Sequence, residues 1–219
     1  MDEIIVRLAR AIASLPRLRM VSLLVREGEL TPTRLAKDLR LPLNVVSLHL
    51  RVLTVAGLIC RRKAGAWCHY RAESPYDSTA PSGRLTAWLC ILLQASSDTS
   101  KEDSGLHEVR NLSSNPEEAL RRVIFEAATA FTDLRRLQVL RFLGRQREAK
   151  ANDLVEVLSI SPQAVGRHMG KLIRRGYVRT QRCSRTVVYT LAPVAKTPVH
   201  KRMLEIVQAA WEQQRFRTS

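Results

Sequence analysis

The chain carries the same residue pattern twice, and this internal repeat restricts its fold more than any other feature. When the second half is shifted by 119 residues, the stretch from Arg17 to Ala72 aligns without a gap, and 12 of its 56 positions are identical. Most of the identities are apolar residues or glycine, which fill cores and end helices. A repeat of this length predicts two copies of one small fold in tandem.

The segment between the two copies has a different composition. Residues 1–95 carry a net charge of +7 and residues 119–219 a net charge of +13, whereas residues 96–118 carry −4. The middle segment is rich in serine, and polar stretches without apolar periodicity are typical of linkers. The predicted boundaries are an N-terminal domain at 1–96, an acidic linker at 97–116 and a C-terminal domain at 117–219.

Each copy is predicted to contain several helices and one β-hairpin, because apolar residues recur at helical spacing and glycines mark the turns. The first copy has predicted helices at 3–14, 17–26, 35–39, 42–56 and 84–95 and strands at 58–61 and 67–71. The second has predicted helices at 116–131, 135–143, 152–158, 161–175 and 198–213 and strands at 177–181 and 186–191. The expected fold class is mainly α with small β-hairpins (α+β), arranged as two tandem winged helix-turn-helix domains.

The chain is strongly basic, with 36 lysines and arginines against 20 acidic residues, a formal net charge of +16 and an isoelectric point near 10.8. Such a charge attracts polyanions, of which nucleic acid is the usual one, although an anionic membrane surface would also fit the charge. No run of 18 apolar residues predicts a membrane span, and the acidic start Met1-Asp2-Glu3 is unlike a signal peptide. We therefore expect a cytoplasmic, nucleoid-associated protein with reduced cysteines and no membrane partner.

A winged helix-turn-helix suits double-stranded DNA, because an α-helix fits the major groove and the hairpin can lie along the backbone or minor groove. Residues 45–59 and 164–178 both resemble the recognition-helix signature of the ArsR family, and residues 15–21 resemble the family's segment entering the second helix. The resemblance covers about residues 4–95 and 117–213. It implies a sequence-specific, DNA-binding transcription regulator that acts as a repressor.

Proteins of that family are usually homodimers that pair through their first and last helices. Two copies in one chain therefore suggest an intramolecular pseudo-dimer. The helix predicted at 84–95 supports this idea, because it is strongly apolar and the second copy could cover it. A homodimer of whole chains, and two units that do not touch each other, stay open as alternatives.

The two predicted recognition helices differ in the side chains that point away from the core. Arginine suits guanine, glutamine and asparagine suit adenine, and an exposed leucine can contact a thymine methyl group or a protein. The second helix is therefore predicted to be the stronger base reader. The candidate base contacts are Asn44, Ser47, Leu48 and Arg51 in the first helix, and Gln163, Gly166, Arg167 and Gly170 in the second.

Basic residues also gather in the predicted wings and at the end of the second recognition helix, where phosphates or the minor groove would pass. The candidate phosphate and wing contacts are Arg61, Arg62, Lys63, Lys171, Arg174, Arg175, Arg179, Arg182 and Arg185. His49 and His168 fall beside the buried positions of the two helices, so we expect packed histidines there rather than titrating switches.

Many ArsR-like proteins bind a metal through cysteines of the third helix or through residues of the last helix. Here residues 33–39 contain no cysteine, and only Cys90 and His200 are candidates in the last helices. Zinc needs three or four ligands, so no metal and no cofactor are predicted. Cys60 and Cys68 lie on the two predicted strands of the first wing, and a reversible disulfide between them is a separate hypothesis.

Two other classes of function compete with this interpretation. One is a protein-interaction adaptor in which the first domain docks a partner and the second holds DNA, which Leu43 and Leu48 favour. The other is an RNA-binding protein, which the low aromatic content of 5% disfavours because single-strand readers use aromatic stacking. The sequence contains none of the phosphate-binding loops or catalytic arrangements that would indicate an enzyme.

Overall fold

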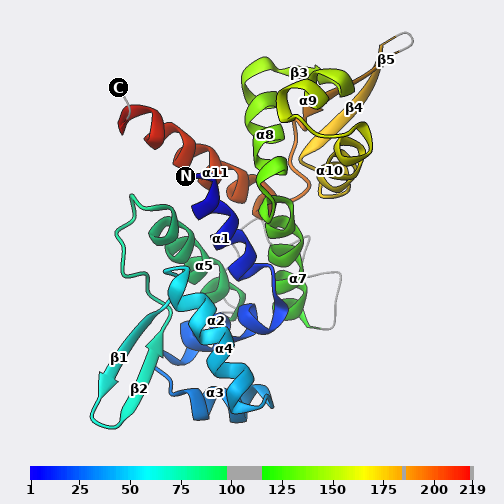
Figure 1. Ribbon diagram of the computed structural model, residues 1–219. Helices are drawn as coiled ribbons and strands as arrows, with labels where there is room; N and C mark the ends of the chain where they lie inside the picture. The colour runs from blue at the N-terminus through cyan, green and yellow to red at the C-terminus, as the bar shows by residue number, and fades with distance from the viewer. Residues whose placement is uncertain (98–114, 184–185, 218–219) are drawn as a thin grey trace.

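The computed structural model describes residues 1–97, 115–183 and 186–217. Its N-terminal part begins with helices and has a hairpin before its last helix (Figure 1). The elements are α1 (Asp2–Ile12), α2 (Leu15–Glu27), α3 (Pro32–Leu39), α4 (Leu43–Val55), β1 (Cys60–Ala64), β2 (Trp67–Arg71) and α5 (Pro81–Ser97).

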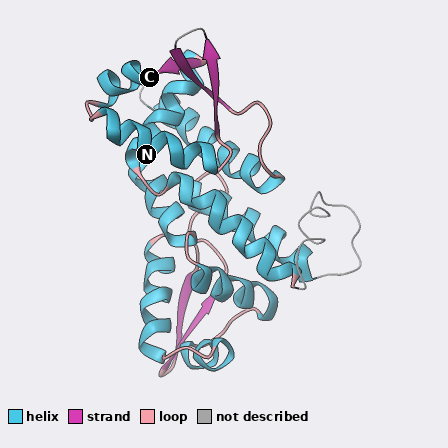
Figure 2. Cartoon of the chain, turned by 90° about the vertical axis from the view of Figure 1, so that its right-hand side faces the viewer, coloured by secondary structure: helices cyan, strands magenta, loops and turns pink. Residues whose placement is uncertain are grey.

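The C-terminal part repeats this order with one additional short strand. Its elements are α7 (Pro116–Ala128), the 3-10 helix η1 (Thr129–Phe131), α8 (Leu134–Gln146), β3 (Glu148–Lys150), α9 (Ala151–Leu158), α10 (Pro162–Arg174), β4 (Val178–Cys183), β5 (Thr186–Leu191) and α11 (Pro198–Arg217). The predicted class, mainly α with small β-hairpins, is confirmed. In Figure 2 the strands lie at the two ends of the molecule and the helices fill the space between them.

The two parts keep the 119-residue register in their backbone as well as in their sequence. Helices α2, α3 and α4 begin and end at positions that correspond to the bounds of α8, α9 and α10. Left-handed or otherwise positive φ angles also recur in register, at Gly28 and Arg147, Arg40 and Ser159, and Gly57 and Gly176. These residues end helices, and a positive φ at such a position satisfies the last carbonyl groups of the helix.

The hairpins begin later than the sequence suggests. In the first wing Leu58 and Ile59, which we expected in a strand, are 1% exposed and lie in the core, and β1 starts at Cys60. In the second wing the strand likewise starts at Val178, after the buried Tyr177. The apolar run therefore reflects burial of the turn that follows the recognition helix, which periodicity alone does not distinguish from a strand.

Strand β3 was not predicted, because three residues with one buried alanine carry no periodic signal. It pairs with β5 to give a three-stranded antiparallel sheet in the order β3-β5-β4. The first wing has only the β1–β2 pair, but Leu30 forms an isolated bridge with Tyr70. That bridge corresponds in the repeat to the pairing of Ala149 with Tyr189, so the same pair of positions is joined in both wings.

A single connected hydrophobic core runs through both parts of the chain. Helices α1 and α5 pack against α7 and α11, where apolar side chains line a small cavity. Ile5, Leu8 and Leu85 contribute from the N-terminal part, and Phe131 and Met203 contribute from the C-terminal part. Phe131 is fully buried in this contact.

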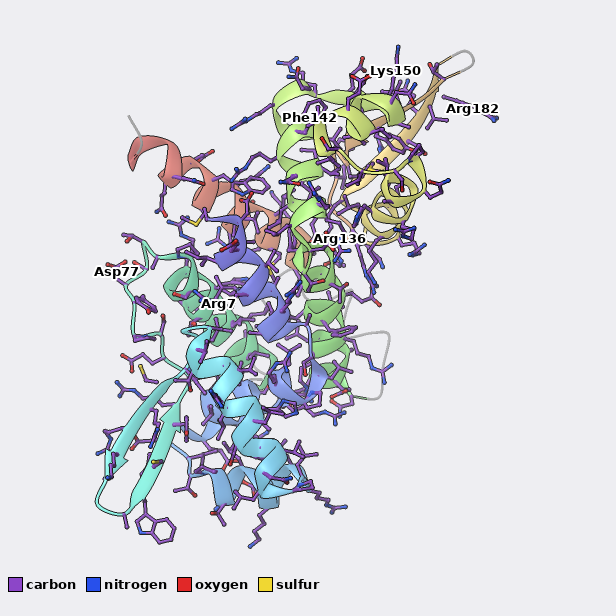
Figure 3. The ribbon with its side chains drawn as sticks, in the orientation of Figure 1. Arg7, Asp77, Arg136, Phe142, Lys150 and Arg182 are labelled. Atoms are coloured by element: carbon purple, nitrogen blue, oxygen red, sulfur yellow. The ribbon has the colours of Figure 1, made fainter. Side chains whose placement is uncertain are left out.

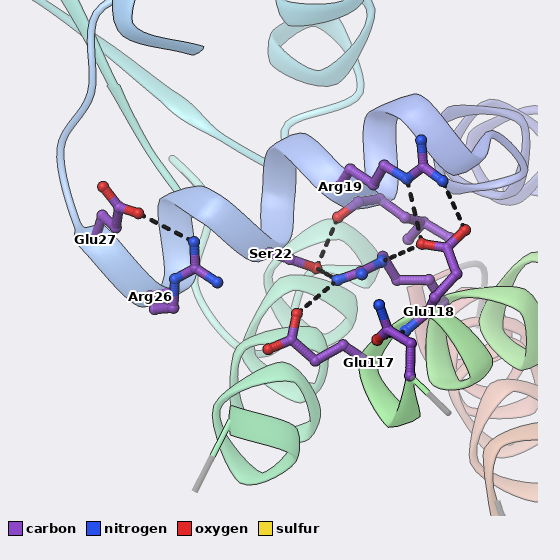
Figure 4. A network of polar contacts seen from close by, with 9 residues as sticks. Arg19, Ser22, Arg26, Glu27, Glu117 and Glu118 are labelled. Atoms are coloured by element: carbon purple, nitrogen blue, oxygen red, sulfur yellow. Dashed lines mark hydrogen bonds and ion pairs between the residues drawn. The ribbon is translucent and has the colours of Figure 1, made fainter. Parts of the chain in front are cut away.

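Polar contacts join the same helices at the edges of the core. The Asp2 carboxylate accepts hydrogen bonds from Arg141 at 2.7 Å and from the Trp211 indole at 2.8 Å, which ties α1 to α8 and α11. Arg19 of α2 binds Glu118 of α7 through two hydrogen bonds, of 2.8 and 3.2 Å (Figure 4). Arg121, 10% exposed at its side chain, binds the same Glu118.

Most of the predicted linker lies outside the described residues. Within the part of the chain that the structure describes, none of the helices combines the length and the apolar character that crossing a membrane requires.

Candidate nucleic-acid interface

Helix α10 is held firmly against the C-terminal core. The Ser161 hydroxyl caps its start by accepting a hydrogen bond from the amide of Ala164 at 3.3 Å, and Pro162 occupies the first turn. Val165, Met169 and Leu172, at most 1% exposed, face the core at helical spacing. The opposite face of the helix is therefore turned to solvent.

The solvent face of α10 carries three of the four base contacts predicted for this helix. Gln163, Gly166 and Arg167 are exposed, as is Arg174 at the end of the helix, and Gly170 is half-buried. A Cβ atom built on Gly166 would meet nothing within 4 Å, so the helix has an open notch beside Arg167. The arrangement presents an arginine and a glutamine on a rigid helix with room for a close approach.

Two contacts join α10 to neighbouring helices, one at its middle and one at its C-terminal end. His168 places Nδ1 at 3.8 Å from Asp133 Oδ1, and Asp133 is the N-cap of α8. At the C-terminal end Arg175 forms an ion pair with Glu126 of α7 at 3.3 Å, and Lys196 binds the same carboxylate at 3.2 Å. Helix α10 is thus linked directly to α7, which packs against the N-terminal part.

Arg175 differs from the other predicted phosphate contacts. Its side chain is 20% exposed and forms an ion pair with Glu126, so it holds the end of α10 against α7. Lys171 is half-buried, and burial followed by the nearby Arg175 lowers the pKa of its ammonium group. Arg174 remains exposed at the end of the helix.

Helix α4 presents a different surface. Val46, Leu50 and Leu53 are fully buried, and Asn44, Ser47, Leu48 and Arg51 are exposed as predicted. Its exposed apolar side chains are large. They are Leu43, Leu48 and Val55, at 50%, 60% and 62% exposure. His49 is half-buried, and burial lowers the pKa of its imidazole, in keeping with a packed histidine.

The wings carry exposed arginines on their outer strands. In the second wing Arg179 and Arg182 of β4 are exposed, and Figure 3 shows Arg182 near the outer end of the hairpin. In the first wing Arg62 forms a bidentate pair with Glu29, at 2.6 and 2.9 Å, and Arg61 donates to the Cys68 sulfur. Lys63 is exposed, and Arg185 lies outside the described residues.

The proposed disulfide of the first wing is wrong. Cys60 is opposite Arg71 in the hairpin, and Cys68 is opposite Lys63. Because side chains alternate along a strand, this register points the two sulfurs to opposite faces of the hairpin. Both cysteines are free thiols.

Sequence reasoning missed several groups around this surface. Lys37 and Arg40 are exposed on and just after α3, and Trp67 in the first wing is 63% exposed. The support that Asp133 gives to α10 was also missed, although an aspartate before a helix is a recognisable N-cap signal. No group of three or more histidine, cysteine or acidic side chains is gathered closely enough for a metal within the described ranges.

The pH dependence of stability should be dominated by His200 above pH 5. His200 is 1% exposed, Nδ1 lies 2.8 Å from Thr197 Oγ1, and burial lowers the imidazole pKa to about 4. The unfolded chain, with a pKa near 6.5, takes up the proton first, so stability is present at neutral pH and is lost as pH falls from about 6.5 toward 4.

We expect the free energy of unfolding to drop by about 2 kcal/mol between pH 7 and pH 5, measured by urea denaturation. The variant His200→Asn should flatten most of this dependence. Burial also lowers the pKa values of His49 and His168, so a smaller pH dependence of the same sign should remain in the variant. An unchanged slope in the variant would contradict the assignment.

Comparison with known proteins agrees with this geometry. The family model described as MarR family matches residues 132–186, the segment that contains α8 to β4. The arsenical resistance operon repressor of Escherichia coli K12 is 34% identical over 85 residues, 39% of this chain and 73% of that protein. The arsenic resistance transcriptional regulator ArsR1 of Pseudomonas putida KT2440 is 30% identical over 93 residues, 42% of this chain and 66% of that protein.

A crystal structure of the AntR antimony-specific transcriptional repressor also matches, with a TM-score of 0.36 at 24% identity, covering 54% of this chain and 95% of that one. The helix-turn-helix pairs, the hairpin wings and the sequence matches define a winged helix, DNA-binding transcription regulator. Within that class the chain belongs to the ArsR family.

Proposed function

We propose that the chain is a transcriptional repressor that binds specific sequences of double-stranded DNA as an intramolecular pseudo-dimer. Residues 1–96 form one winged helix unit, residues 117–219 form the other, and residues 97–116 join them. The observation that carries the proposal is the exposed face of α10, with Gln163, Gly166 and Arg167 set on a capped and anchored helix. Such a protein would reside with the nucleoid.

The chemistry of α10 fits the major groove. Arginine makes bidentate hydrogen bonds to guanine, and glutamine makes them to adenine. Arg179 and Arg182 on the wing are placed to neutralise phosphates, and those contacts position the protein without selecting a sequence. Repression would follow if the bound site overlaps a promoter.

The pseudo-dimer is supported by the continuity of the core. Helices α1 and α5 bury apolar side chains against α7 and α11. These are the first and last helices of the two units, through which the resemblance to the ArsR family implies pairing. The Asp2 contacts with Arg141 and Trp211, and the pair of Arg19 with Glu118, close the edges of this surface. A surface already covered within the chain leaves no need for a second chain there.

Titration of labelled duplex DNA, single-stranded DNA and RNA by fluorescence anisotropy tests the proposal. Duplex DNA from the promoter region of the gene that encodes this protein should bind most tightly. The protein's affinity for it should exceed its affinity for random duplex DNA by at least about 1,000-fold. Equal binding of all three polymers, with one steep salt dependence, would reduce the chain to a nonspecific polyanion binder.

Gly166 offers a sharper test because stability and affinity should change in opposite directions. A Cβ atom at this exposed helical position meets nothing within 4 Å, so Gly166→Ala should raise the free energy of unfolding by about 0.5–1 kcal/mol. If the notch lies against a base edge, the same methyl group should weaken operator binding several-fold.

Gly144→Ala on α8 is the matched control. Its Cβ atom would lie 3.9 Å from Leu191, an ordinary contact, and α8 is not part of the proposed DNA surface. It should gain similar stability and leave affinity unchanged. Identical affinities for the two variants would remove Gly166 from the interface.

A further inference from the structure

We propose that the operator of this protein is not palindromic: α10 reads a half-site that contains guanine, and α4 lies on an A/T-rich half-site where Leu48 contacts a thymine methyl group. The inference rests on the proposed function and goes beyond it by naming the two halves of the target. Subunits of a homodimer present identical side chains, and their operators mirror that symmetry. A single chain has no such constraint.

The backbone around the two recognition helices is the same in both units. Helices α4 and α10 have corresponding bounds and bury residues at corresponding positions, Val46 with Val165, Leu50 with Met169 and Leu53 with Leu172. The turns that follow share a positive φ at Gly57 and Gly176, 72° and 73°. The two helices are therefore presented in the same way, and any difference in specificity comes from their side chains.

The outward side chains differ at every corresponding position. Leu48 stands where α10 has Arg167, and Val55 stands where it has Arg174. Conversely, Arg51 stands where α10 has Gly170. A leucine that is 60% exposed cannot donate a hydrogen bond to guanine, but it can pack on the C5-methyl group of thymine. Two surfaces so unlike cannot prefer the same base sequence.

The helices that precede α4 and α10 differ in charge in the opposite sense: α3 is the more basic of the two, and α9 the less basic. In the N-terminal unit Lys37 and Arg40 are exposed at the end of α3, where the C-terminal unit has Glu156 and Ser159. The N-terminal unit thus has cations beside a recognition helix whose own exposed cation is Arg51, whereas the C-terminal unit has Arg167 and Arg174 on the helix and no cation at these flanking positions. Cations that flank the groove bind phosphates, which favours affinity without base selection in the N-terminal half.

The experiment is selection of bound sequences from a random duplex pool, made in parallel with the intact full chain and three variants. The variants are Arg167→Ala, Leu48→Arg and the control Arg202→Ala, whose side chain is half exposed and paired with Glu205 on α11. Leu48 and Arg167 are both exposed, so neither variant should disturb folding, and thermal melting would check this.

The unmodified chain should select two unlike halves, with guanine strongly preferred in one only. Arg167→Ala should lower that guanine preference about tenfold or more and leave the other half intact. Leu48→Arg should create a guanine preference in the A/T-rich half and make the motif more nearly symmetric. Arg202→Ala should select the original motif.

A palindromic motif for the unmodified chain would overturn this inference and leave the proposed function standing. A motif with one half only, unchanged by Leu48→Arg, would overturn it as well, because α4 would then not lie on DNA and its apolar face would belong to a protein partner. If no sequence is selected, the proposed function fails together with the inference.

Discussion

Replacing Phe131 by alanine is expected to lower the free energy of unfolding by about 3–5 kcal/mol. Phe131 is fully buried and lines the cavity shared by α1, α5 and α11. Its ring packs edge-on against the Tyr177 ring, with 4.8 Å between the two ring centroids. The alanine would remove contacts on both sides of that cavity. Chemical denaturation followed by circular dichroism measures the loss.

Because Phe131 joins the two parts, its loss should reach the N-terminal part as well. Amide hydrogen exchange should speed up in α1 and α5 together with α7 and α11. Phe142→Ala, at a half-buried position of α8, is the control and should cost less and leave α5 protected. If exchange in α1 and α5 does not respond to the loss of Phe131, the two parts fold independently.

Arg167→Ala should have the largest effect on function. The side chain is exposed on α10 beside the open notch at Gly166, and a bidentate contact with guanine contributes about 1–3 kcal/mol of discrimination. We expect the preference for operator over a guanine-substituted duplex to fall by about 10- to 100-fold. Competition titrations against both duplexes give this ratio.

Arg182→Ala separates base recognition from phosphate binding. Arg182 lies on β4 of the wing. Its loss should therefore lower the affinity for all duplexes equally and reduce the slope of log affinity against log salt by about 1. If Arg167→Ala also lowered the affinity for every DNA sequence equally, the two arginines would have the same role. That result would exclude α10 as the base-reading helix.

The repeat could be predicted because it depends on residues with few alternatives. Helix bounds follow from buried residues at helical spacing, such as Val46, Leu50 and Leu53, and from glycines that alone adopt the turn conformation easily, such as Gly57. The same logic predicts which side chains of α4 and α10 face solvent. The candidate base contacts that it supplies stay predictions, and Gly170, which was expected to face solvent, is half-buried.

The errors come from interactions between segments. The register of β1 with β2 decides that Cys60 and Cys68 face opposite ways, and a shift of one residue would change the answer. Strand β3 exists only because β5 offers it a partner. Arg175 looked like a phosphate ligand, but Glu126, 49 residues earlier in the chain, engages it in the fold.

The proposed pseudo-dimer requires that one chain supplies both DNA-reading units. Sedimentation equilibrium of the purified complex with a duplex that carries the full selected operator measures this directly. The pseudo-dimer predicts one chain of 24.8 kDa per duplex, and footprinting of the same complex should show both halves of the operator protected from cleavage. Two chains per duplex, each protecting one half, would contradict it and would make the protein a conventional homodimer.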